Sequence, residues 1–564
     1  MSAFTTEMFT AAPVFGKGMV TGEPHAPVRH TWAEVHCTAS RMAGSLAKAG
    51  VGPGDSVAIL AGEPVDIAPL IQAVWLRGGS VTMLHQPTPR TDLAIWVENT
   101  LTILAMIGAR TVLVDARFGP AAAVLVENGI SVHAVEALAD GIPIAPYDSG
   151  EEDIAFLQLT SGSTGIPKAV AISHRNLDET IRTMAAAAKA DPTTDVMVTW
   201  LPLFHDMGMI GFLVAPMRLG IEAICITPME FLRSPLLWPA LITKYRGTMT
   251  AAPNFAYEVL ARRLHHAADD AYDLSSLRFV LNGAEPIDCT TITTFLESAG
   301  RFGLKETALV AAYGMAEATL AVSFTNPGET ITIDTVDTHG VETAGWARAS
   351  RGKNTRSFVK LGSPLPGIEL RVVGEDGSVR RHRQIGEFAI RGVAVTRRYV
   401  TLAGSQNALD ADGWLATGDL GYLTETGEIV VCGRKKDMII VAGRNICPTD
   451  IERAAGRVDG VRSGNAVAVR LTSSEQRESF AVAVESHAHD NSQEKGRIMN
   501  EVSKAVFAEI GVSPRLVAVT GPGTLPKTPS GKLRRSATYS IIEAELEKLD
   551  RSLALTGSRI ERSA

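Results

Sequence analysis

The chain has 564 residues, of which 45% are hydrophobic and 20% charged, a balance typical of a folded globular protein with several structural units. Its formal net charge of -7 gives no overall positive field, so we do not expect a nucleic-acid-binding protein. The sequence shows no secretory leader pattern and no transmembrane segment, which would need roughly 18 uninterrupted apolar residues. The five cysteines match neither a zinc site nor a disulfide framework, which favours a reducing, cytoplasmic location.

Helix-like and strand-like segments alternate through residues 31–330. A helical pattern over residues 31–49 leads into an apolar strand at 57–60. Further short apolar strands are expected at 111–114, 223–226, 249–252 and 279–282. This alternation predicts an α/β fold with buried, doubly wound parallel sheets.

A run of hydroxyl residues and glycines follows the apolar segment 154–159 and precedes a helix expected to open at Ser173. Small residues let backbone N–H and side-chain O–H groups converge on phosphate oxygens, which predicts a nucleotide-polyphosphate loop. It is not the P-loop of kinases, because Pro167 precedes the lysine and Ala169 replaces the metal-binding hydroxyl. The alternative is an ordinary Ser/Gly turn. The run comprises Thr160, Ser161, Gly162, Ser163, Thr164, Gly165, Ile166, Pro167 and Lys168.

Two later apolar runs end in residues that can bind a ligand. One ends in Gly283, Ala284 and Glu285, and the other ends in a tyrosine followed closely by a carboxylate. Doubly wound sheets bind ligands at such strand ends, although a single tyrosine there is more often part of the core. The second group comprises Tyr313, Gly314, Met315, Ala316 and Glu317.

The sequence pattern changes between Pro366 and Arg398. Alternating residues and turn glycines at 366–398 predict a small antiparallel sheet. After residue 434, strands are expected at 438–441, 465–469, 480–484 and 516–519, with one helix capped near Thr449 and another over 495–509. We therefore predict an N-terminal domain over 1–433, with a β subdomain at about 362–433, and an α+β lid domain over 434–564.

Three more motifs follow in order: Thr417-Gly418-Asp419, residues 433–437 (Gly-Arg-Lys-Lys-Asp) and residues 526–535 (Pro-Lys-Thr-Pro-Ser-Gly-Lys-Leu-Arg-Arg). Together with the earlier motifs, this order resembles the adenylate-forming ligase superfamily over nearly the whole chain. That superfamily includes acyl-CoA synthetases, fatty acyl-AMP ligases and nonribosomal peptide adenylation domains. The resemblance implies activation of a carboxylic acid by ATP and Mg²⁺ to an acyl adenylate, with a C-terminal domain that moves.

The resemblance also implies roles for individual residues. The loop 160–168 would hold the β- and γ-phosphates, and Glu317 with Thr164 would bind Mg²⁺, a hard cation that prefers oxygen ligands. Tyr313 would stack on adenine beside residues 283–285 and 314–316. Asp419 would accept hydrogen bonds from the ribose hydroxyls, with Arg434 nearby.

Lys532 is the expected catalytic residue. As the substrate carboxylate attacks the α-phosphate, a fixed ammonium would stabilise the growing negative charge of the transition state. The alternative is a solvated basic tail, because Lys527, Arg534 and Arg535 lie close in the sequence. The position that matches the hinge of the superfamily is Lys436.

The residues at 200–211 and 251–257 resemble those of fatty acyl-AMP ligases most closely. His205, Asn254 and Phe255 are the expected substrate contacts, and the many apolar side chains either line an acyl tunnel or form ordinary core. We find no conspicuous acidic residue at the position that recognises amino acids, which makes amino-acid adenylation a weaker hypothesis.

The spacing after Glu317 bears on the acceptor. Gly362 follows it by 45 positions, more than acyl-CoA synthetases usually have, and the surplus falls in 331–358. The resemblance implies the insertion that restrains domain rotation and disfavours CoA, so that the acceptor is the phosphopantetheine arm of an acyl carrier protein. CoA remains the alternative, because the insertion is unusually polar and Cys447 replaces a common aromatic.

A catalytically silent nucleotide- or lipid-binding protein is a third hypothesis. Six arginines between Arg380 and Arg398 either dock an acidic carrier or form a solvated face.

Overall fold

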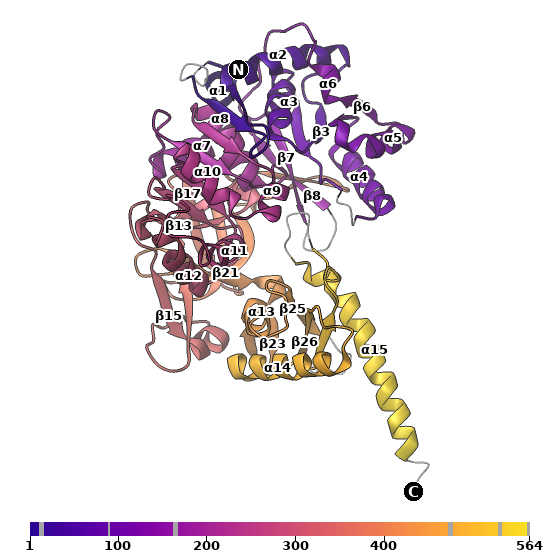
Figure 1. The fold of residues 1–564 in the computed structure, drawn as a ribbon, viewed down its shortest axis with the longest axis vertical. Helices are drawn as coiled ribbons and strands as arrows, with labels where there is room; N and C mark the ends of the chain where they lie inside the picture. The colour runs from indigo at the N-terminus through magenta and orange to yellow at the C-terminus, as the bar shows by residue number, and fades with distance from the viewer. Residues whose placement is uncertain (11–15, 88–90, 162–166, 472–477, 528–532, 561–564) are drawn as a thin grey trace.

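The structure is a computed structural model that describes residues 1–10, 16–87, 91–161, 167–471, 478–527 and 533–560, with backbone only at 10, 161 and 549–560. The N-terminal body carries two large sheets, and the C-terminal unit lies below it in Figure 1. None of the helices in these ranges is long and apolar enough to cross a membrane.

The first large sheet has the order β14-β13-β12-β11-β9-β10-β1-β2. Its six inner strands run parallel, and the edge strands β2 and β14 are antiparallel to their neighbours. The carboxyl ends of the inner strands therefore meet at one edge. The strands are β1 (Gly18–Thr21), β2 (Val28–Thr31), β9 (Val196–Thr199), β10 (Glu222–Cys225), β11 (Met249–Ala252), β12 (Phe279–Asn282), β13 (Leu309–Gly314) and β14 (Ala321–Phe324).

The second large sheet has the order β20-β19-β8-β7-β4-β3-β5-β6. Strands β7, β4, β3, β5 and β6 are parallel, whereas β8, β19 and β20 extend the sheet in antiparallel fashion. Its strands are β3 (Ser56–Leu60), β4 (Ser80–Met83), β5 (Thr111–Val114), β6 (Ser131–Ala134), β7 (Ile154–Ser161), β8 (Pro167–Ser173), β19 (Arg398–Thr401) and β20 (Gly404–Asn407).

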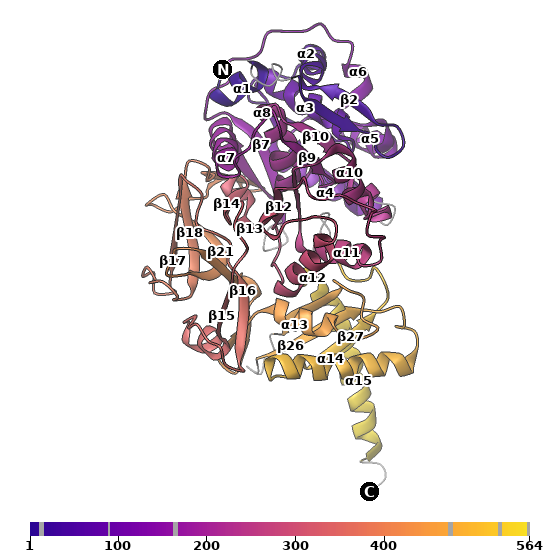
Figure 2. The same ribbon diagram turned by 60° about the vertical axis from the view of Figure 1, so that its left-hand side comes forward.

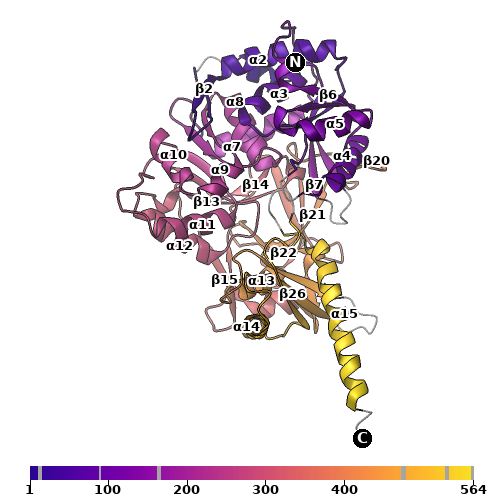
Figure 3. The same cartoon turned by 45° about the vertical axis from the view of Figure 1, so that its right-hand side comes forward.

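Helices form three layers around these two sheets. One apolar core joins both sheets to a central layer formed mainly by α3 (Pro64–Leu76), α7 (His174–Ala187) and the π-helix η3 (Met207–Val214). Figure 3 places α10, α11 and α12 on one side of the body and α4 and α5 on the other. The remaining helices are α1 (Ala3–Thr10), α2 (Trp32–Lys48), α4 (Leu93–Ile107), α5 (Gly119–Glu127), α6 (Val135–Leu138), α8 (Ala215–Leu219), α9 (Pro228–Arg233), α10 (Leu237–Tyr245), α11 (Asn254–Leu264) and α12 (Cys289–Gly300).

A four-stranded antiparallel sheet and a separate hairpin follow this body. The sheet contains β17 (Ile368–Val373), β18 (Gly386–Gly392), β21 (Leu415–Leu423) and β22 (Ile429–Arg434). The hairpin pairs β15 (Ile333–Asp337) with β16 (Thr355–Val359) around the short π-helix η6 (Gly340–Ala344). Figure 2 shows the hairpin beside α13 (Pro448–Gly456) and α14 (Ser492–Ile510) of the C-terminal unit.

The C-terminal unit packs helices on both faces of the sheet β25-β26-β27. Helices α13 and α14 share one apolar core with this sheet, and the start of α15 packs on the opposite face. Its elements are β23 (Ile439–Val441), β24 (Arg444–Ile446), α13 (Pro448–Gly456), β25 (Ala466–Leu471), β26 (Ser479–Glu485), α14 (Ser492–Ile510), β27 (Leu516–Thr520) and α15 (Arg535–Ile560).

The predicted fold class is confirmed. Helix α7 opens at the expected place, with Ser173 as its N-cap residue, and strand β8 lies between the phosphate loop and this helix. Helix α13 is capped by Cys447, two positions before Thr449. Strands β19 and β20, within the predicted β subdomain, pair in the second large sheet and not in the small one. The domain boundary at residue 433 stays a prediction.

Candidate active site

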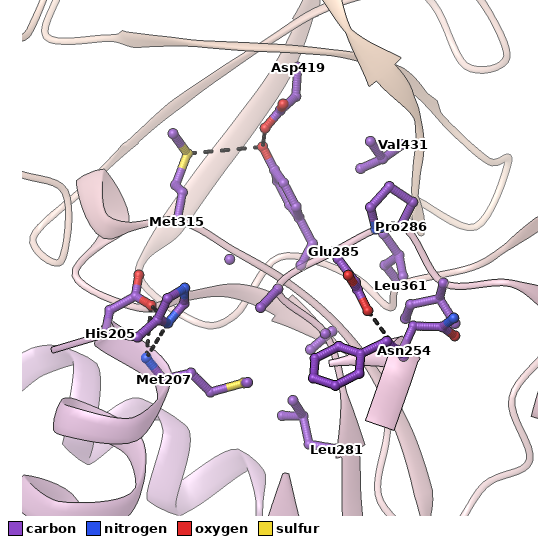
Figure 4. Close-up of a pocket in the computed structure, with 18 of the residues that line it drawn as sticks. His205, Met207, Asn254, Leu281, Glu285, Pro286, Met315, Leu361, Asp419 and Val431 are labelled. Carbon is purple, nitrogen blue, oxygen red and sulfur yellow. Dashed lines mark hydrogen bonds and ion pairs between the residues drawn. The ribbon is translucent and has the colours of Figure 1, made fainter. Parts of the chain in front are cut away.

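A cavity of about 1450 Å³ lies at the carboxyl edge of the first sheet. Its walls come from this sheet, from β8, from the small antiparallel sheet and from the C-terminal unit. Figure 4 shows side chains from several of these elements pointing into the same space. This edge is where open parallel sheets bind their ligands.

Lys168, Glu317 and Tyr399 form one polar cluster in the wall of the cavity. The Nζ atom of Lys168, on β8, lies 3.0 Å from Oε1 of Glu317, which follows the end of β13. The Tyr399 hydroxyl donates to the same carboxylate oxygen at 3.2 Å, and Lys168 Nζ lies 3.8 Å from the centre of its ring. Burial, with Glu317 nearby, raises the pKa of Tyr399, so its hydroxyl stays protonated.

Tyr313, Asp419 and Arg434 form a second cluster. The Tyr313 hydroxyl donates to Oδ2 of Asp419 at 2.7 Å, and Arg434 Nε lies 2.9 Å from Oδ1. Asp419 on β21 faces Arg434 on β22 in the register of the small sheet. Burial raises the pKa of Asp419, while Arg434 opposes that shift. Because Tyr313 and Arg434 each hold one of its oxygens, the carboxylate is fixed in orientation where it lines the cavity (Figure 4).

The strand-end residues 283–285 lie between these clusters and α11. Ala284 has a φ of 66°, in the left-handed region that residues other than glycine rarely adopt. Glu285 Oε1 accepts a hydrogen bond of 2.7 Å from the backbone N–H of Phe255, in the first turn of α11. At Gly314 a Cβ atom would lie only 2.2 Å from the carbonyl oxygen of Leu320, so a side chain would not fit there. These residues, with Met315 and Ala316, line the cavity.

The expected substrate contacts also line the cavity, but two of them have structural partners. Asn254 Oδ1 accepts bonds from Asn282 Nδ2 at 3.3 Å and from the backbone N–H of Asp288 at 3.2 Å. His205 Nδ1 lies 2.6 Å from Oδ1 of Asp206, directly before η3. Asn254 thus ties α11 to the end of β12, and His205 is held by its neighbour.

Sequence reasoning missed three residues of the site. Tyr399 gave no signal, because its contact with Lys168 and Glu317 depends on the pairing of β19 with β8. Asp206 was also missed; it lines the cavity and lies next to His205. Its pairing with His205 was readable from their adjacency. His85 also lines the cavity, and burial together with His205 lowers its pKa to about 4.

Several predicted residues lie outside the described part of the chain: Gly162, Ser163, Thr164, Gly165 and Lys532. Their flanks are described. Thr160 and Lys168 line the cavity, and Ser161 pairs with Pro167 in the register of β7 and β8. Lys527 and Leu533, the described residues on either side of 528–532, form a β-bridge, and Leu533 lines the cavity. Lys436 lines it as well, next to Asp437, which pairs with Arg535 at 3.2 Å.

Comparisons with known proteins agree with this geometry. The family model for AMP-binding enzymes matches residues 11–400. The Mycobacterium tuberculosis protein Rv1013, whose name gives it as a ligase without a stated substrate, is 54% identical over 96% of this chain and 100% of its own. The long-chain-fatty-acid–AMP ligase FadD26 of Mycobacterium marinum is 31% identical over 90% of each chain.

A solved structure from a study of fatty acyl-adenylate ligases of E. coli and L. pneumophila superimposes with a TM-score of 0.88. It is 28% identical and covers 96% of this chain and 98% of its own. These findings confirm the resemblance that the motifs predicted. The chain belongs to the family of AMP-binding enzymes.

Proposed function

We propose that the protein is a fatty acyl-AMP ligase. It activates a fatty acid with ATP to an acyl adenylate, releases pyrophosphate, and transfers the acyl group to the phosphopantetheine thiol of an acyl carrier protein. The observation that carries this proposal is one continuous cavity whose polar end holds Lys168, Glu317, Tyr313 and Asp419 and whose other end is apolar. The names of the relatives support the same substrate class.

In the first step, a carboxylate oxygen of the fatty acid attacks the α-phosphorus of ATP. The bond from that phosphorus to the oxygen bridging the β-phosphate breaks, and pyrophosphate leaves. Negative charge on the phosphate oxygens increases, so ammonium groups fixed at this end stabilise the transition state. Lys168 is positioned for this role by Glu317 and Tyr399, and Lys532 is the proposed second ammonium.

The described residues offer Mg²⁺ one carboxylate ligand, Glu317. No group of three or more metal-binding side chains occurs in the described ranges. Glu317 is a single partly buried carboxylate, and Mg²⁺ is commonly bound by one or two carboxylates with phosphate oxygens and waters as its other ligands. Glu317, with Thr164 outside the described residues, is the proposed ligand set. The ion would neutralise charge on the polyphosphate.

In the second step, the thiol attacks the acyl carbonyl carbon and AMP leaves. Two ion pairs from the hairpin to the C-terminal unit support a carrier protein as the acceptor. Arg356 lies 2.8 Å from Asp450, and Arg444 lies 2.7 Å from Glu342. These contacts hold the unit that must rotate before CoA can be used. Carrier docking by the arginines at 380–398 gains no such support, because Arg380, Arg383 and Arg391 pair with carboxylates.

Two linked assays test the proposal. Purified protein is incubated with ATP, Mg²⁺ and fatty acids of graded length, and exchange of labelled pyrophosphate into ATP is measured. The accumulated acyl adenylate is then chased with CoA or with a carrier protein that bears phosphopantetheine, and the products are identified by mass. We expect exchange, and acyl transfer to the carrier only. Consumption of the adenylate by CoA would establish an acyl-CoA ligase instead, and no exchange with any acid would contradict the proposal.

A further inference from the structure

The apolar end of the cavity, here called the arm, has three walls. The lining residues of α7 are Ile181, Met184, Ala185 and the C-cap residue Ala188. The first and last are each three or four positions from the two middle ones, so all four form one stripe of the helix. A second wall comes from η3 and α8, and the third is the first large sheet. Alanines in the α7 stripe leave space that larger residues would fill.

The arm ends on a row of three large side chains. Met197, Met249 and Phe279 lie in register on the adjacent strands β9, β11 and β12. Residues paired in this way point to the same face of the sheet, and all three line the cavity. They lie near the amino ends of their strands, whereas the nucleotide-side residues lie at the carboxyl ends. The arm therefore follows the length of the strands.

An ion-pair network closes the arm behind this row. Arg278 Nε donates to Asp195 Oδ1 at 2.8 Å, and Nη1 donates to the carbonyl of Ala188 at 2.8 Å. Nη2 lies 3.6 Å from the sulfur of Met249. Arg278 thus joins the end of α7 to the amino edge of the sheet, directly beneath the methionine, and leaves an acyl chain no exit there.

The dimensions of the arm give a length for its occupant. Four residue steps separate Phe279 from Gly283, which is about 13 Å along a strand. A staggered carbon chain with bonds of about 1.5 Å advances about 1.25 Å per carbon. We propose that Met197, Met249 and Phe279 act as a ruler that limits the acyl substrate to roughly ten carbons. This inference rests on the proposed function and adds the chain length of the fatty acid.

The test is the chain-length profile of pyrophosphate exchange with saturated acids from butyrate to stearate. We expect kcat/KM to rise about threefold to fourfold per added carbon while methylenes enter the arm. Beyond the limit, it should fall by roughly tenfold or more, because a longer chain overpacks the floor. Met249→Ala removes three heavy atoms beyond Cβ and should move the maximum about three carbons longer. Ala185→Met fills the arm and should move it about three carbons shorter.

Met42→Ala is the matched control, because Met42 is a buried methionine of α2 outside the cavity lining. It should lose stability as Met249→Ala does, with the wild-type profile unchanged. Equal use of decanoate and stearate by the wild type, or an unshifted maximum in a folded Met249→Ala protein, would overturn the ruler. If no acid supports exchange, the proposed function fails. Binding of the same acids without ATP, measured by calorimetry, then tests the ruler separately: affinity should fall for chains longer than the proposed limit.

Discussion

At the scale of single residues, the cluster around Lys168 couples two groups that are proposed to act on phosphate. The aromatic ring of Tyr399 contacts the ammonium, and its hydroxyl contacts the Glu317 carboxylate. A cation above an aromatic face is stabilised by the quadrupole of the ring, so each half of this side chain has its own partner. One residue therefore positions both the lysine and the proposed metal ligand.

Tyr399→Phe separates these two contributions. It keeps the ring beneath Lys168 and removes the bond to Glu317, so we expect kcat/KM for ATP in pyrophosphate exchange to fall by roughly three- to tenfold. Tyr399→Leu removes both contacts and should lose clearly more. Tyr147→Phe, at a tyrosine that is 40% exposed, is the control. Equal losses in the Phe and Leu variants would show that the ring contact with Lys168 contributes nothing.

His174 gives the fold a pH dependence. It is 1% exposed between Phe4 and Trp75, and burial lowers its pKa to about 4. The unfolded chain binds the proton more readily, with a pKa of about 6.5, so stability is lost as the pH falls from about 6.5 towards 4. At pH 5 this costs about 2 kcal/mol relative to pH 7.

The expected result for His174→Phe is a smaller loss of stability between pH 7 and pH 5, measured by denaturant unfolding. The exposed His266→Phe serves as the comparison and should keep the wild-type slope. A His174→Phe protein with an unchanged slope would assign the acid sensitivity to other groups.

At the scale of elements, the hairpin β15–β16 contacts the C-terminal unit through two ion pairs, Arg356 with Asp450 and Glu342 with Arg444. Both acidic partners and Arg356 are largely buried. Removing Glu342 takes the carboxylate partner from Arg444, whereas Asp450 keeps its second pair, with Arg453 at 3.1 Å, when Arg356 is removed. The double variant Arg356→Ala/Glu342→Ala should loosen the unit and raise CoA-dependent consumption of acyl adenylate several-fold, with pyrophosphate exchange little changed. Arg351→Ala, at an exposed position of the same hairpin, should leave CoA use at the wild-type level. Unchanged CoA use in the double variant would show that these contacts do not restrain the unit.

The elements also show which features could be predicted. Apolar runs such as 249–252 and 279–282 coincide with buried strands, because a strand covered on both faces reads as a continuous apolar segment. The order of strands could not be read in the same way, because β19 joins β8 across more than two hundred residues. Tyr399 reaches the site only through that pairing. Residues 313–317, which have a local sequence signal of their own, line the cavity.

At the scale of the whole molecule, the proposed catalysis depends on the position of the C-terminal unit. The loop that carries Lys532 starts and ends at the bridge of Lys527 with Leu533, and Leu533 already lines the cavity. Arg535, directly after this loop, pairs with Asp437 beside the proposed hinge Lys436 and with Glu452 of α13. Rotation at the hinge would therefore carry the loop away from the cavity as one piece with the unit.

This arrangement predicts that the two half-reactions separate. Lys532→Ala should reduce pyrophosphate exchange by about 10²–10³ or more, because a charge that stabilises the transition state at phosphorus is lost. Transfer from preformed acyl adenylate to the carrier should stay near the wild-type rate, because the proposed role of Lys532 belongs to the adenylation step alone. Lys527→Ala, at the other end of the same loop, controls for loss of positive charge and should retain exchange. Equal loss of both half-reactions in Lys532→Ala would mean that the lysine serves the folded unit as a whole and not the adenylation step.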